Sequence, residues 1–369
     1  MGSPLNKISI SGFKSIRKLQ DFDLKNLNMI VGMNGAGKSN FVSLFRMLRA
    51  MSEEGLASFV TKNGGADGFF FGGPKESPQI KAHLCFGQNE YAFVLEPTAS
   101  GDLMVKSEST LWKGGGDWKY YWGGQIESRL KQWRDKPSKW GPYRGTEAHI
   151  YEAVSSWLVY HFHDTSMTAP LRRDQSVRDW RELNPDASNI AAFLLRLRTR
   201  NNDTYEKIRE TIQLIAPFFD DFLLEPEDKG DNEVVRLEWR QKGSSFPFQP
   251  WQLSDGTIRF ICLAAALLQP SPPATVVIDE PELGLHPFAL DVLAGLFRDA
   301  SERTQLVVST QSAGLLNHFE PEDVIVVDRE HGASRFRRLD AASLAAWLED
   351  FSLGELWQKN VFDGGPSHE

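Results

Sequence analysis

Residues 32–39 read Gly32-Met-Asn-Gly-Ala-Gly-Lys-Ser39, and they match the phosphate-binding pattern G-x-x-x-x-G-K-[ST] at every fixed position. Glycines in such a loop let backbone N–H groups turn inward around phosphate oxygens, at the positive end of the following helix. Lys38 is expected to reach the β- and γ-phosphates of a nucleotide, and the Ser39 hydroxyl to bind magnesium. The other predicted nucleotide contacts in this stretch are Asn34, Gly35, Ala36, Gly37 and Asn40.

The residues on either side of the loop predict a strand before it and a helix after it. Residues 27–31 form a short apolar run. After Lys38, apolar residues follow the i, i+3, i+4, i+7 spacing of a helix with one buried face, at Phe41, Leu44, Phe45 and Leu48. Strand, glycine loop and helix together form the opening unit of a nucleotide-binding α/β domain.

A second motif, Val276-Val-Ile-Asp-Glu280, is an apolar strand that ends in two carboxylates. On its own it is equally typical of a strand followed by an acidic turn. Ligands bind at the carboxyl ends of strands in an open α/β sheet. With a phosphate loop in the same chain, we expect Asp279 to hold magnesium and Glu280 to orient or deprotonate the attacking water.

A third motif, Leu253-Ser-Asp-Gly-Thr257, reads as an ordinary helix start with Ser254 as N-cap. Gly256 allows another group to approach the backbone closely. The motif opens the helix that leads into the Asp279 strand, and this position gives it a second interpretation as part of a nucleotide site.

Length and composition restrict the class of protein. The chain has 369 residues, a formal net charge of -8 and 41% hydrophobic residues, which suits a folded protein with a substantial core. No apolar run approaches the roughly 20 residues of a membrane span, and the N-terminus lacks the apolar stretch of a signal peptide. Two cysteines without short metal-ligand spacing argue against a disulfide scaffold or a zinc knuckle. We expect a cytoplasmic protein with no membrane segment.

Changes in composition predict the organisation of the chain. Apolar runs alternating with helical periodicity indicate an α/β fold whose core sheet is largely parallel and covered on both faces. Residues 1–165 and 234–335 are expected to form a discontinuous core lobe. Residues 166–233 are expected to form a helical lobe, with helix over 186–224, and residues 336–369 a helical tail. A Trp-rich insertion at about 111–144 contains Trp112, Trp118, Trp122, Trp133 and Trp140.

The combination of motifs resembles the bacterial RecF-like ATPases of the AAA family, which are ABC-type P-loop proteins related to the ATPase domains of SMC proteins and OLD-family nucleases. The resemblance runs nearly end to end and is carried by these stretches: Gly12-Phe-Lys-Ser15, Gly32 to Asn40, Tyr160-His-Phe-His-Asp-Thr165, Leu253 to Phe260, Ile278 to Pro287, Ser309-Thr-Gln-Ser312 and Trp347 to Trp357. It implies an ABC-type fold with a mixed core sheet and an inserted helical lobe, binding ATP and magnesium.

The resemblance also implies roles for individual residues. Ser254, Asp255 and Gly256 would contact the γ-phosphate held by the opposite subunit of a head-to-tail homodimer. Phe13 and Lys14 would lie near the adenine, although Phe13 could equally be an edge-strand residue. The segment from Glu282 to Pro287 resembles the D-loop, which communicates across the dimer.

The chain departs from the family pattern at two places. Gln311 stands where most ABC ATPases carry a histidine, and glutamine cannot carry a positive charge, so slow hydrolysis is expected. The Q-loop is not obvious. His163 to Ser166 is the favoured position and Gln88 the other candidate, while His161 and His163 could instead pack or form a metal pair.

Two further stretches leave their roles open. Trp residues beside Lys131, Arg134, Lys136 and Lys139 could stack on unpaired bases, line a protein interface or pack a small core of their own. The basic stretch Arg172, Arg173, Arg178 and Arg181 is expected to be a solvated surface or a contact for DNA or a partner.

The resemblance implies an ATP-driven switch in DNA maintenance, repair or defence against phage. OLD-family relatives carry a C-terminal nuclease domain, and the roughly forty residues after Asp328 are too few for one. A separate effector, such as a nuclease, is therefore expected as partner, and DNA is a further candidate. The alternatives are the ATPase subunit of a membrane transporter and a regulatory ATP-binding switch with little turnover.

Overall fold

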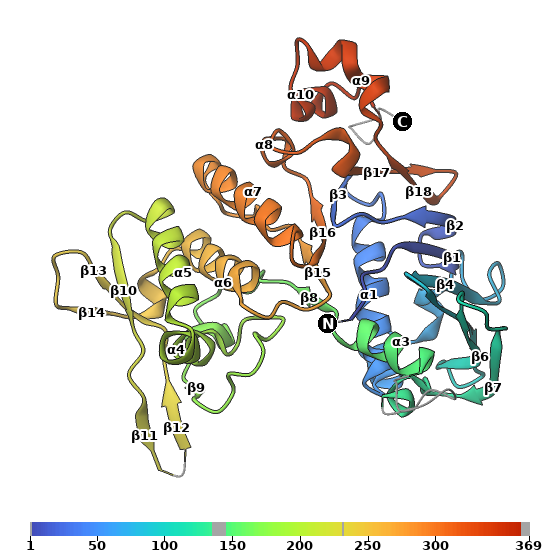
Figure 1. The fold of residues 1–369 in the computed structure, drawn as a ribbon, viewed down its shortest axis with the longest axis horizontal. Helices are drawn as coiled ribbons and strands as arrows, with labels where there is room; N and C mark the ends of the chain where they lie inside the picture. The colour runs from blue at the N-terminus through green and yellow to red at the C-terminus, as the bar shows by residue number, and fades with distance from the viewer. Residues whose placement is uncertain (1, 135–144, 231, 363–369) are drawn as a thin grey trace.

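The computed structural model describes residues 2–134, 145–230 and 232–362. Within these residues the chain forms two six-stranded sheets, two three-stranded sheets and helices that pack around them (Figure 1). The two large sheets share one hydrophobic cluster that contains residues from both. These two sheets, and the way they meet, position the predicted nucleotide site.

The first large sheet is the predicted, mostly parallel core. Its order is β18-β17-β3-β16-β15-β8, and every neighbouring pair is parallel except β17 with β18. The strands are β3 (Leu27–Val31), β8 (Leu158–Tyr160), β15 (Thr275–Asp279), β16 (Gln305–Thr310), β17 (Val324–Glu330) and β18 (Ala333–Arg338). β18 runs past residue 335, where the sequence predicted the core lobe to end.

Both faces of this sheet are buried, as predicted, and the alternation of side chains shows how. Ile30, Val277 and Val307 point into one hydrophobic cluster. Their neighbours Met29 and Ile278 point into a separate cluster on the other face. Burying a Val or Ile side chain stabilises the fold by roughly 1.5–3 kcal/mol. Side chains that point to either face of the sheet are therefore apolar, which is why these strands appear in the sequence as continuous apolar runs.

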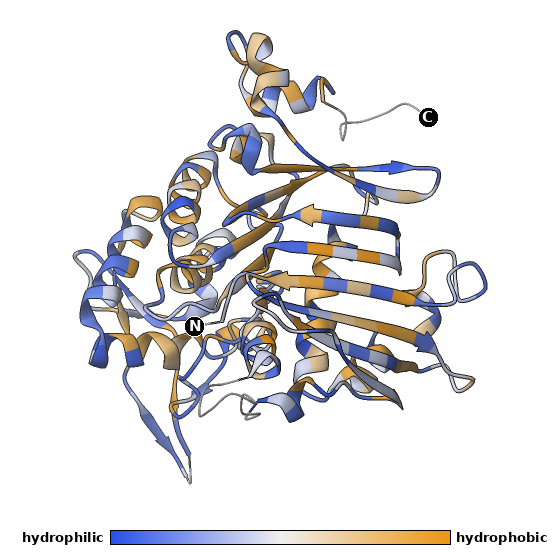
Figure 2. Ribbon diagram, turned by 45° about the vertical axis from the view of Figure 1, so that its right-hand side comes forward, coloured by the Kyte–Doolittle hydropathy of each residue, from blue (hydrophilic) through white to orange (hydrophobic). Residues whose placement is uncertain are grey.

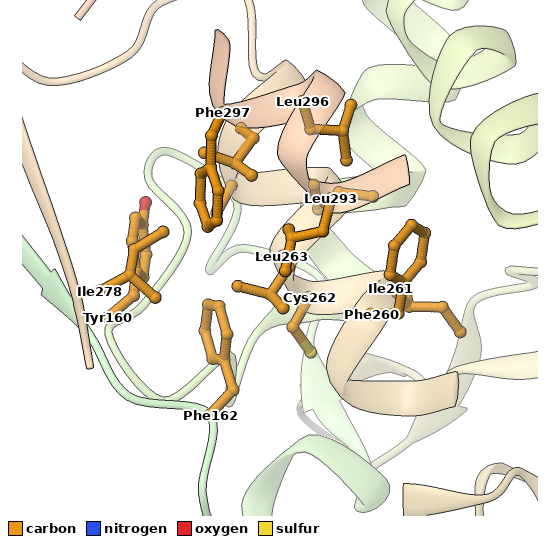
Figure 3. Close-up of a cluster of buried hydrophobic side chains, with 14 of the residues drawn as sticks. Tyr160, Phe162, Phe260, Ile261, Cys262, Leu263, Ile278, Leu293, Leu296 and Phe297 are labelled. Carbon is orange, nitrogen blue, oxygen red and sulfur yellow. The ribbon is translucent and has the colours of Figure 1, made fainter. Parts of the chain in front are cut away.

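Helices cover the two faces of the parallel sheet separately. α1 (Lys38–Ser52), α2 (Leu56–Lys62) and α3 (Thr146–Ser155) contribute to the cluster on the Val277 face. α6 (Asp255–Leu268) and α7 (Pro287–Ser301) pack on the Ile278 face. Figure 3 shows Ile278 and Tyr160 from the sheet directed toward Leu263 of α6 and Phe297 of α7. The phosphate-loop helix and the Ser254 helix thus lie on opposite faces of the sheet.

The second large sheet is antiparallel throughout, with the order β2-β1-β4-β5-β6-β7. The strands are β1 (Lys7–Phe13), β2 (Ile16–Asp23), β4 (Ile80–Phe86), β5 (Asn89–Pro97), β6 (Leu103–Trp112) and β7 (Lys119–Gln125). Leu84, Tyr91 and Phe93 on its inner face join the cluster that contains α1. Hydrophilic residues alternate with hydrophobic ones along these strands (Figure 2). One face of this sheet is therefore core and the other is largely polar.

The first part of the Trp-rich stretch extends the antiparallel sheet. Trp112 ends β6, and Trp122 lies on the edge strand β7 with 69% of its surface exposed. Trp133 is buried and contacts Tyr91 and Tyr121. The predicted residues Lys136, Lys139 and Trp140 lie outside the described residues.

The region predicted as a helical lobe is only partly helical. Its helices are α4 (Ile190–Arg200) and α5 (Asn202–Ile215). The expectation of helix through residue 224 is wrong, because Pro217 follows the helix and Phe219 and Phe222 pair in a strand with β13. The remaining strands are β9 (Gln175–Ser176), β10 (Phe219–Leu223), β11 (Glu227–Lys229), β12 (Asn232–Val235), β13 (Glu238–Gln241) and β14 (Pro247–Phe248).

The C-terminal part contains three short helices, α8 (Ala313–Leu316), α9 (Ala341–Leu348) and α10 (Leu353–Gln358). Gly354 of α10 lies so close to α8 that an added Cβ would stand 2.1 Å from the Ala313 carbonyl oxygen. Figure 1 shows the tail helices α9 and α10 beyond the edge of the parallel sheet that β17 and β18 form. Among the described residues, no helix combines the length and the apolar character needed to cross a bilayer.

Candidate nucleotide-binding site

The phosphate loop connects β3 to α1 and owes its shape to three glycines. Gly37 has φ +116, and an added Cβ would stand 1.9 Å from Ser334 Oγ and 2.6 Å from Ser15 Oγ. A Cβ on Gly32 would stand 2.2 Å from the Val327 carbonyl oxygen. Gly35 also has a positive φ, of +80, but no atom of the described residues lies within 4 Å of the position that its Cβ would take. Gly37 and Gly32 are therefore required by contacts, and Gly35 by backbone conformation alone.

Side chains from β18, from the turn between β1 and β2, and from α1 hold the loop. Ser334 Oγ, on β18, lies 2.5 Å from the Ala36 carbonyl oxygen and 2.7 Å from Ser15 Oγ. Ser15 lies in the turn between β1 and β2, and its hydroxyl accepts a hydrogen bond of 2.7 Å from Asn40 Nδ2. Ala36 is buried, whereas Asn34, Gly35 and Ser39 are exposed. The loop thus offers an open side to a ligand and a fixed side to the protein.

Lys38 is the first residue of α1 and is 5% exposed. Its Nζ donates hydrogen bonds to the carbonyl oxygens of Gly32, at 2.6 Å, and Met33, at 3.1 Å. Burial lowers the pKa of the amine, and the carboxylates of Glu280, Asp279 and Glu282 oppose that shift. The ammonium group is therefore held under the loop, near the acidic residues that it was predicted to work with.

The two predicted carboxylates stand at the carboxyl end of β15. Asp279 pairs with Ser309 of β16, and β16 separates β15 from β3. Asp279 Oδ1 and Ser309 Oγ are buried and have no hydrogen-bond partner among the described residues. A buried carboxylate oxygen without a partner is unfavourable unless a cation or water satisfies it. Together with the exposed hydroxyl of Ser39, this oxygen-rich donor set fits magnesium, which prefers oxygen ligands.

Glu280 has the left-handed backbone conformation, with φ +47, which is unusual for a residue other than glycine. Its N–H donates to the Ser309 carbonyl oxygen at 2.8 Å, so the turn is fixed to the neighbouring strand. Such conformations cost of order 1–3 kcal/mol and concentrate at functional sites. This strain supports a functional role for the Glu280 carboxylate.

Gln311 is placed by two acidic residues of the same loop. Its side-chain Nε2 donates to Glu280 Oε1, and its backbone N–H donates to Glu282 Oε1 at 2.7 Å. Burial raises the pKa of Glu282, and within the part of the chain that the structure describes its Oε2 has no hydrogen-bond partner. Sequence reasoning assigned Glu282 only to the segment resembling the D-loop. Its second role, holding the Gln311 backbone beside Glu280, could have been suspected from its position two residues after Glu280, with Pro281 between them.

Phe13 and Lys14 were predicted to lie near the adenine. The ring of Phe13 is fully buried and packs against Phe69, so it cannot meet a base without leaving the core. Its placement is that of a core residue of β1. Lys14 Nζ donates to Ser43 Oγ at 2.8 Å, and burial, reinforced by Arg46, lowers its pKa. For Lys14 the role near the base stays a prediction.

The Ser254 segment forms a separate small site. Ser254 Oγ accepts a hydrogen bond from Thr257 N at 3.1 Å and so caps α6. A Cβ on Gly256 would stand 2.2 Å from the Gly284 carbonyl oxygen, so α6 begins in direct contact with the loop after Glu280. A pocket of about 160 Å³ lies here, lined by Ile215, Ser254, Gly256, Thr257, Gly284, Leu285, His286, Phe288 and Ala289. No residue of the phosphate loop lines it.

Two buried arginines connect this segment to the end of β8. Arg172 is 4% exposed, its Nη2 pairs with Asp255 Oδ1 at 2.8 Å, and its Nε donates to the Thr165 carbonyl oxygen at 2.9 Å. Arg172 was predicted with its neighbours as a surface or DNA contact, and its burial makes that interpretation wrong for this residue. Arg259 donates through Nε to the Phe162 carbonyl oxygen at 2.9 Å and through Nη1 to the Leu283 carbonyl oxygen.

The two candidates for the Q-loop lie in different places. His163 Nε2 lies 3.0 Å from the Asp279 carbonyl oxygen, beside the predicted magnesium site. Gln88 lies in the turn between β4 and β5, next to Gly87, whose N–H donates to Asn6 Oδ1. Asn6 precedes β1, at the end remote from Ser15. Of the two, only the His163 segment is close to Asp279.

The architecture is similar to that of solved structures. A crystal structure of an "SmcHead bound to the C-winged helix domain of ScpA" aligns with a TM-score of 0.56 and 17% sequence identity, covering 93% of this chain and 99% of that chain. An Smc head domain with an extended coiled coil, bound to the C-terminal domain of ScpA and derived from Pyrococcus furiosus, aligns with a TM-score of 0.54 and 16% identity, covering 94% and 99%. These likenesses show the mixed α/β fold of ABC-type P-loop ATPases.

No curated protein matches the sequence. A protein family does, over residues 27–317, which run from β3 before the phosphate loop to the end of α8 after Gln311. This range contains all three motifs and both buried arginines. The chain therefore belongs to the ATPase family described as "AAA domain, putative AbiEii toxin, Type IV TA system".

Proposed function

We propose that two copies of this chain close head to tail around ATP and hydrolyse it at composite sites. The observation that carries this proposal is the separation of two half-sites. The phosphate loop, Asp279 and Glu280 gather at one edge of the parallel sheet, whereas the Ser254 pocket contains none of the loop residues. A second copy related by a twofold axis would bring its Ser254 pocket to the open side of the loop.

At the loop half-site, Lys38 would exchange its bonds to the Gly32 and Met33 carbonyl oxygens for bonds to phosphate oxygens. Ser39 and Asp279 would hold magnesium, which supplies positive charge to the phosphates. Glu280 would accept the proton of the water that attacks the γ-phosphate, while the ADP oxygen leaves as that bond breaks. Gln311, held by Glu280 and Glu282, would orient this water as a neutral hydrogen-bonding group, consistent with slow turnover.

At the opposite half-site, Ser254, Gly256 and the N-terminus of α6 would contact the γ-phosphate of the partner's ATP. A helix N-terminus with free N–H groups favours an anion. Loss of the γ-phosphate would remove these contacts and loosen the pair. Because Arg259 links α6 to Phe162 and Leu283, movement of α6 would reach the end of β8 and the loop after Glu280.

The output of this cycle would be a movement passed to a partner effector. We infer a role in DNA maintenance, repair or anti-phage defence, in a RecF-like or OLD-like setting, with a nuclease or DNA among the candidate partners. The family description names a putative toxin of a type IV system, which is compatible with defence. The aligned SMC heads are bound to domains of ScpA, so this fold can carry a separate protein partner.

A regulatory switch with little turnover is the second candidate, because Gln311 gives the site no positive charge at the position it occupies beside Glu280. The two proposals differ in rate and not in architecture. Phosphate release measured for the natural chain and for Glu280→Gln separates them, since a pure binder would give equal values. A transporter subunit, the remaining alternative, would copurify with a multispanning protein.

The composite site is tested by the mass of the Glu280→Gln protein in light scattering, with and without magnesium and ATP. ATP is expected to double the mass, because the variant binds nucleotide without removing the γ-phosphate. Ser254→Arg in the same background should keep ATP binding and abolish the dimer, since the long side chain would fill the pocket of about 160 Å³. An ATP-dependent dimer that persists in Ser254→Arg would contradict the head-to-tail arrangement.

A further inference from the structure

Strand pairing in the antiparallel sheet brings together three residues with different donor atoms. Cys85 on β4 lies directly opposite Glu90 on β5. His83 lies two residues before Cys85 on the same strand and therefore on the same face. This is the face opposite the one that carries Leu84 and Tyr91 into the core. The spacing of these residues in the sequence matches no standard metal-binding pattern of cysteines and histidines.

The donor atoms are close enough for one ion to contact all three. His83 Nε2 lies 2.8 Å from Glu90 Oε2 and 3.9 Å from Cys85 Sγ. The three ligand atoms lie within 4.8 Å of one another. Metal–ligand bonds of about 2.0–2.3 Å at tetrahedral angles separate neighbouring donors by roughly 3.3–3.7 Å. Small side-chain rotations would therefore bring the three atoms into a coordination sphere.

We propose that His83, Cys85 and Glu90 bind a divalent cation of the zinc class. A thiolate and an imidazole select zinc over magnesium or calcium, which prefer oxygen donors. Three protein ligands leave the fourth position to water or to a group of a partner. The site is distinct from the predicted magnesium site, which offers oxygen donors at the edge of the parallel sheet.

The surroundings of the cluster leave one Glu90 oxygen and the His83 ring open to an ion, although the Lys113 ammonium opposes a second positive charge. Lys113 Nζ contacts Glu90 Oε1 at 2.6 Å, and the other oxygen, Oε2, faces His83. The Trp118 ring packs edge-on against the imidazole, with ring centroids 5.6 Å apart. Cys85 and Glu90 are buried, while the His83 side chain is 34% exposed and gives an ion access from solvent. Lys113 and Trp118 both come from the turn between β6 and β7, so the ion would also fix this turn.

Binding at this site must displace the proton of the thiol. Burial, together with the Glu90 carboxylate, raises the pKa of Cys85 to about 11, so without a cation the thiol keeps its proton. On binding, the S–H bond breaks, the sulfur forms a bond to the metal and the proton passes to solvent. A bound zinc ion supplies the charge that makes this exchange favourable.

Cobalt(II) is the probe, because a cobalt–thiolate bond gives a charge-transfer absorption that oxygen ligands do not give. We expect the full chain, freed of metal by chelation and without nucleotide, to develop this band with one equivalent of Co²⁺. Zn²⁺ should remove the band by competition. His83→Gln and Glu90→Gln should each weaken binding at least as much as the roughly 10–100-fold typical for outer-shell partners.

Cys85→Ser should abolish the band, and Cys262→Ser should leave it intact, because Cys262 is buried in α6 away from the cluster. Circular dichroism checks that each variant is folded. If Cys85→Ser does not fold, the weaker Co²⁺ binding expected of His83→Gln provides the test instead. Absence of the band at a large excess of Co²⁺, or its survival in Cys85→Ser, would overturn the proposal. Neither outcome bears on ATP hydrolysis, so this site and the proposed ATPase site are tested separately.

Discussion

The two large sheets place their functional residues by different rules. In the parallel sheet every strand except β18 points the same way, so the carboxyl ends of β3, β15 and β16 meet at one edge. The phosphate loop and Gln311 follow β3 and β16 directly, and Asp279 is the last residue of β15. In the antiparallel sheet, the register across hairpins decides which residues are neighbours. Cys85 pairs with Glu90, and His83, two residues before Cys85 on the same face, therefore lies beside Glu90 as well. The end of a strand thus predicts where functional residues lie in the first sheet, whereas in the second sheet the register between strands decides it.

The largest expected effect tests whether the reaction belongs to the parallel sheet. Glu280→Gln should lower kcat for ATP hydrolysis by about 10²–10⁴-fold, because it removes the proposed general base while keeping its size. ATP binding should persist. Steady-state phosphate release and nucleotide titration measure the two quantities.

The matched control is Glu96→Gln on β5 of the antiparallel sheet, whose carboxylate pairs with Lys106 Nζ at 2.6 Å. Its hydrolysis rate should stay close to that of the natural chain. Equal losses in both variants would mean that the reaction does not depend on the edge of the parallel sheet.

The next effect concerns the loop where the two sheets meet. Gly37→Ala places a Cβ 1.9 Å from Ser334 Oγ and should weaken ATP binding by about 2–3 kcal/mol, as overpacking does. The new Cβ in Gly35→Ala has no atom of the described residues within 4 Å. This variant should weaken ATP binding by about 1 kcal/mol, because alanine disfavours the positive φ of this position. ATP titrations of the two purified variants provide the comparison. Equal affinities would show that contact with β18 does not shape the loop.

A smaller effect compares a valine in the parallel sheet, which is buried on both faces, with a valine on the outer face of the antiparallel sheet. Val277→Ala removes two methyl groups from a fully buried position of the parallel sheet and should destabilise the protein by about 2 kcal/mol. Val94→Ala, on the half-buried outer face of β5, should cost about 0.5 kcal/mol. Denaturant unfolding of both variants measures these values. A larger loss at Val94 would mean that the outer face is covered by something that binds it.

The smallest effect concerns the contact between the sheets themselves. Ser334→Ala removes the hydroxyl that lies 2.7 Å from Ser15 Oγ and 2.5 Å from the Ala36 carbonyl oxygen. The substitution should lower the free energy of unfolding, measured in denaturant, by about 1 kcal/mol. A double-mutant cycle with Ser15→Ala should give a coupling of at least about 0.5 kcal/mol. Strict additivity of the two substitutions would show that these hydroxyls do not act together.

The sequence predicted the parallel sheet well, because its evidence is local. Apolar runs such as Leu27–Val31 need only a buried position on both faces, and the motifs follow them without interruption. The helix that starts after Ser254 was predicted for the same reason, since an N-cap and helical periodicity are read within a few residues. These are interactions between neighbours in the chain.

What the sequence did not show depends on distant pairing. Phe219 and Phe222 continued a helical pattern until pairing with β13 made them a strand. Arg172 looked like part of a basic surface, and only the packing of α6 reveals that it is buried against Asp255. Phe13 belongs to a motif, but its ring joins the core of the antiparallel sheet. Register and burial of this kind have no signature within a short window of sequence.

The separation of the phosphate loop from the Ser254 pocket has a genetic consequence. In the proposed pair, a chain carrying Lys38→Ala still offers a sound pocket, and a chain carrying Ser254→Arg still offers a sound loop. Each variant alone should be inactive, whereas a mixed pair keeps one intact composite site. Two defective alleles expressed together would then complement each other, because the mixed pair keeps one intact site. Mixing the two purified variants and measuring regained hydrolysis shows whether the halves of one site are inherited on different chains.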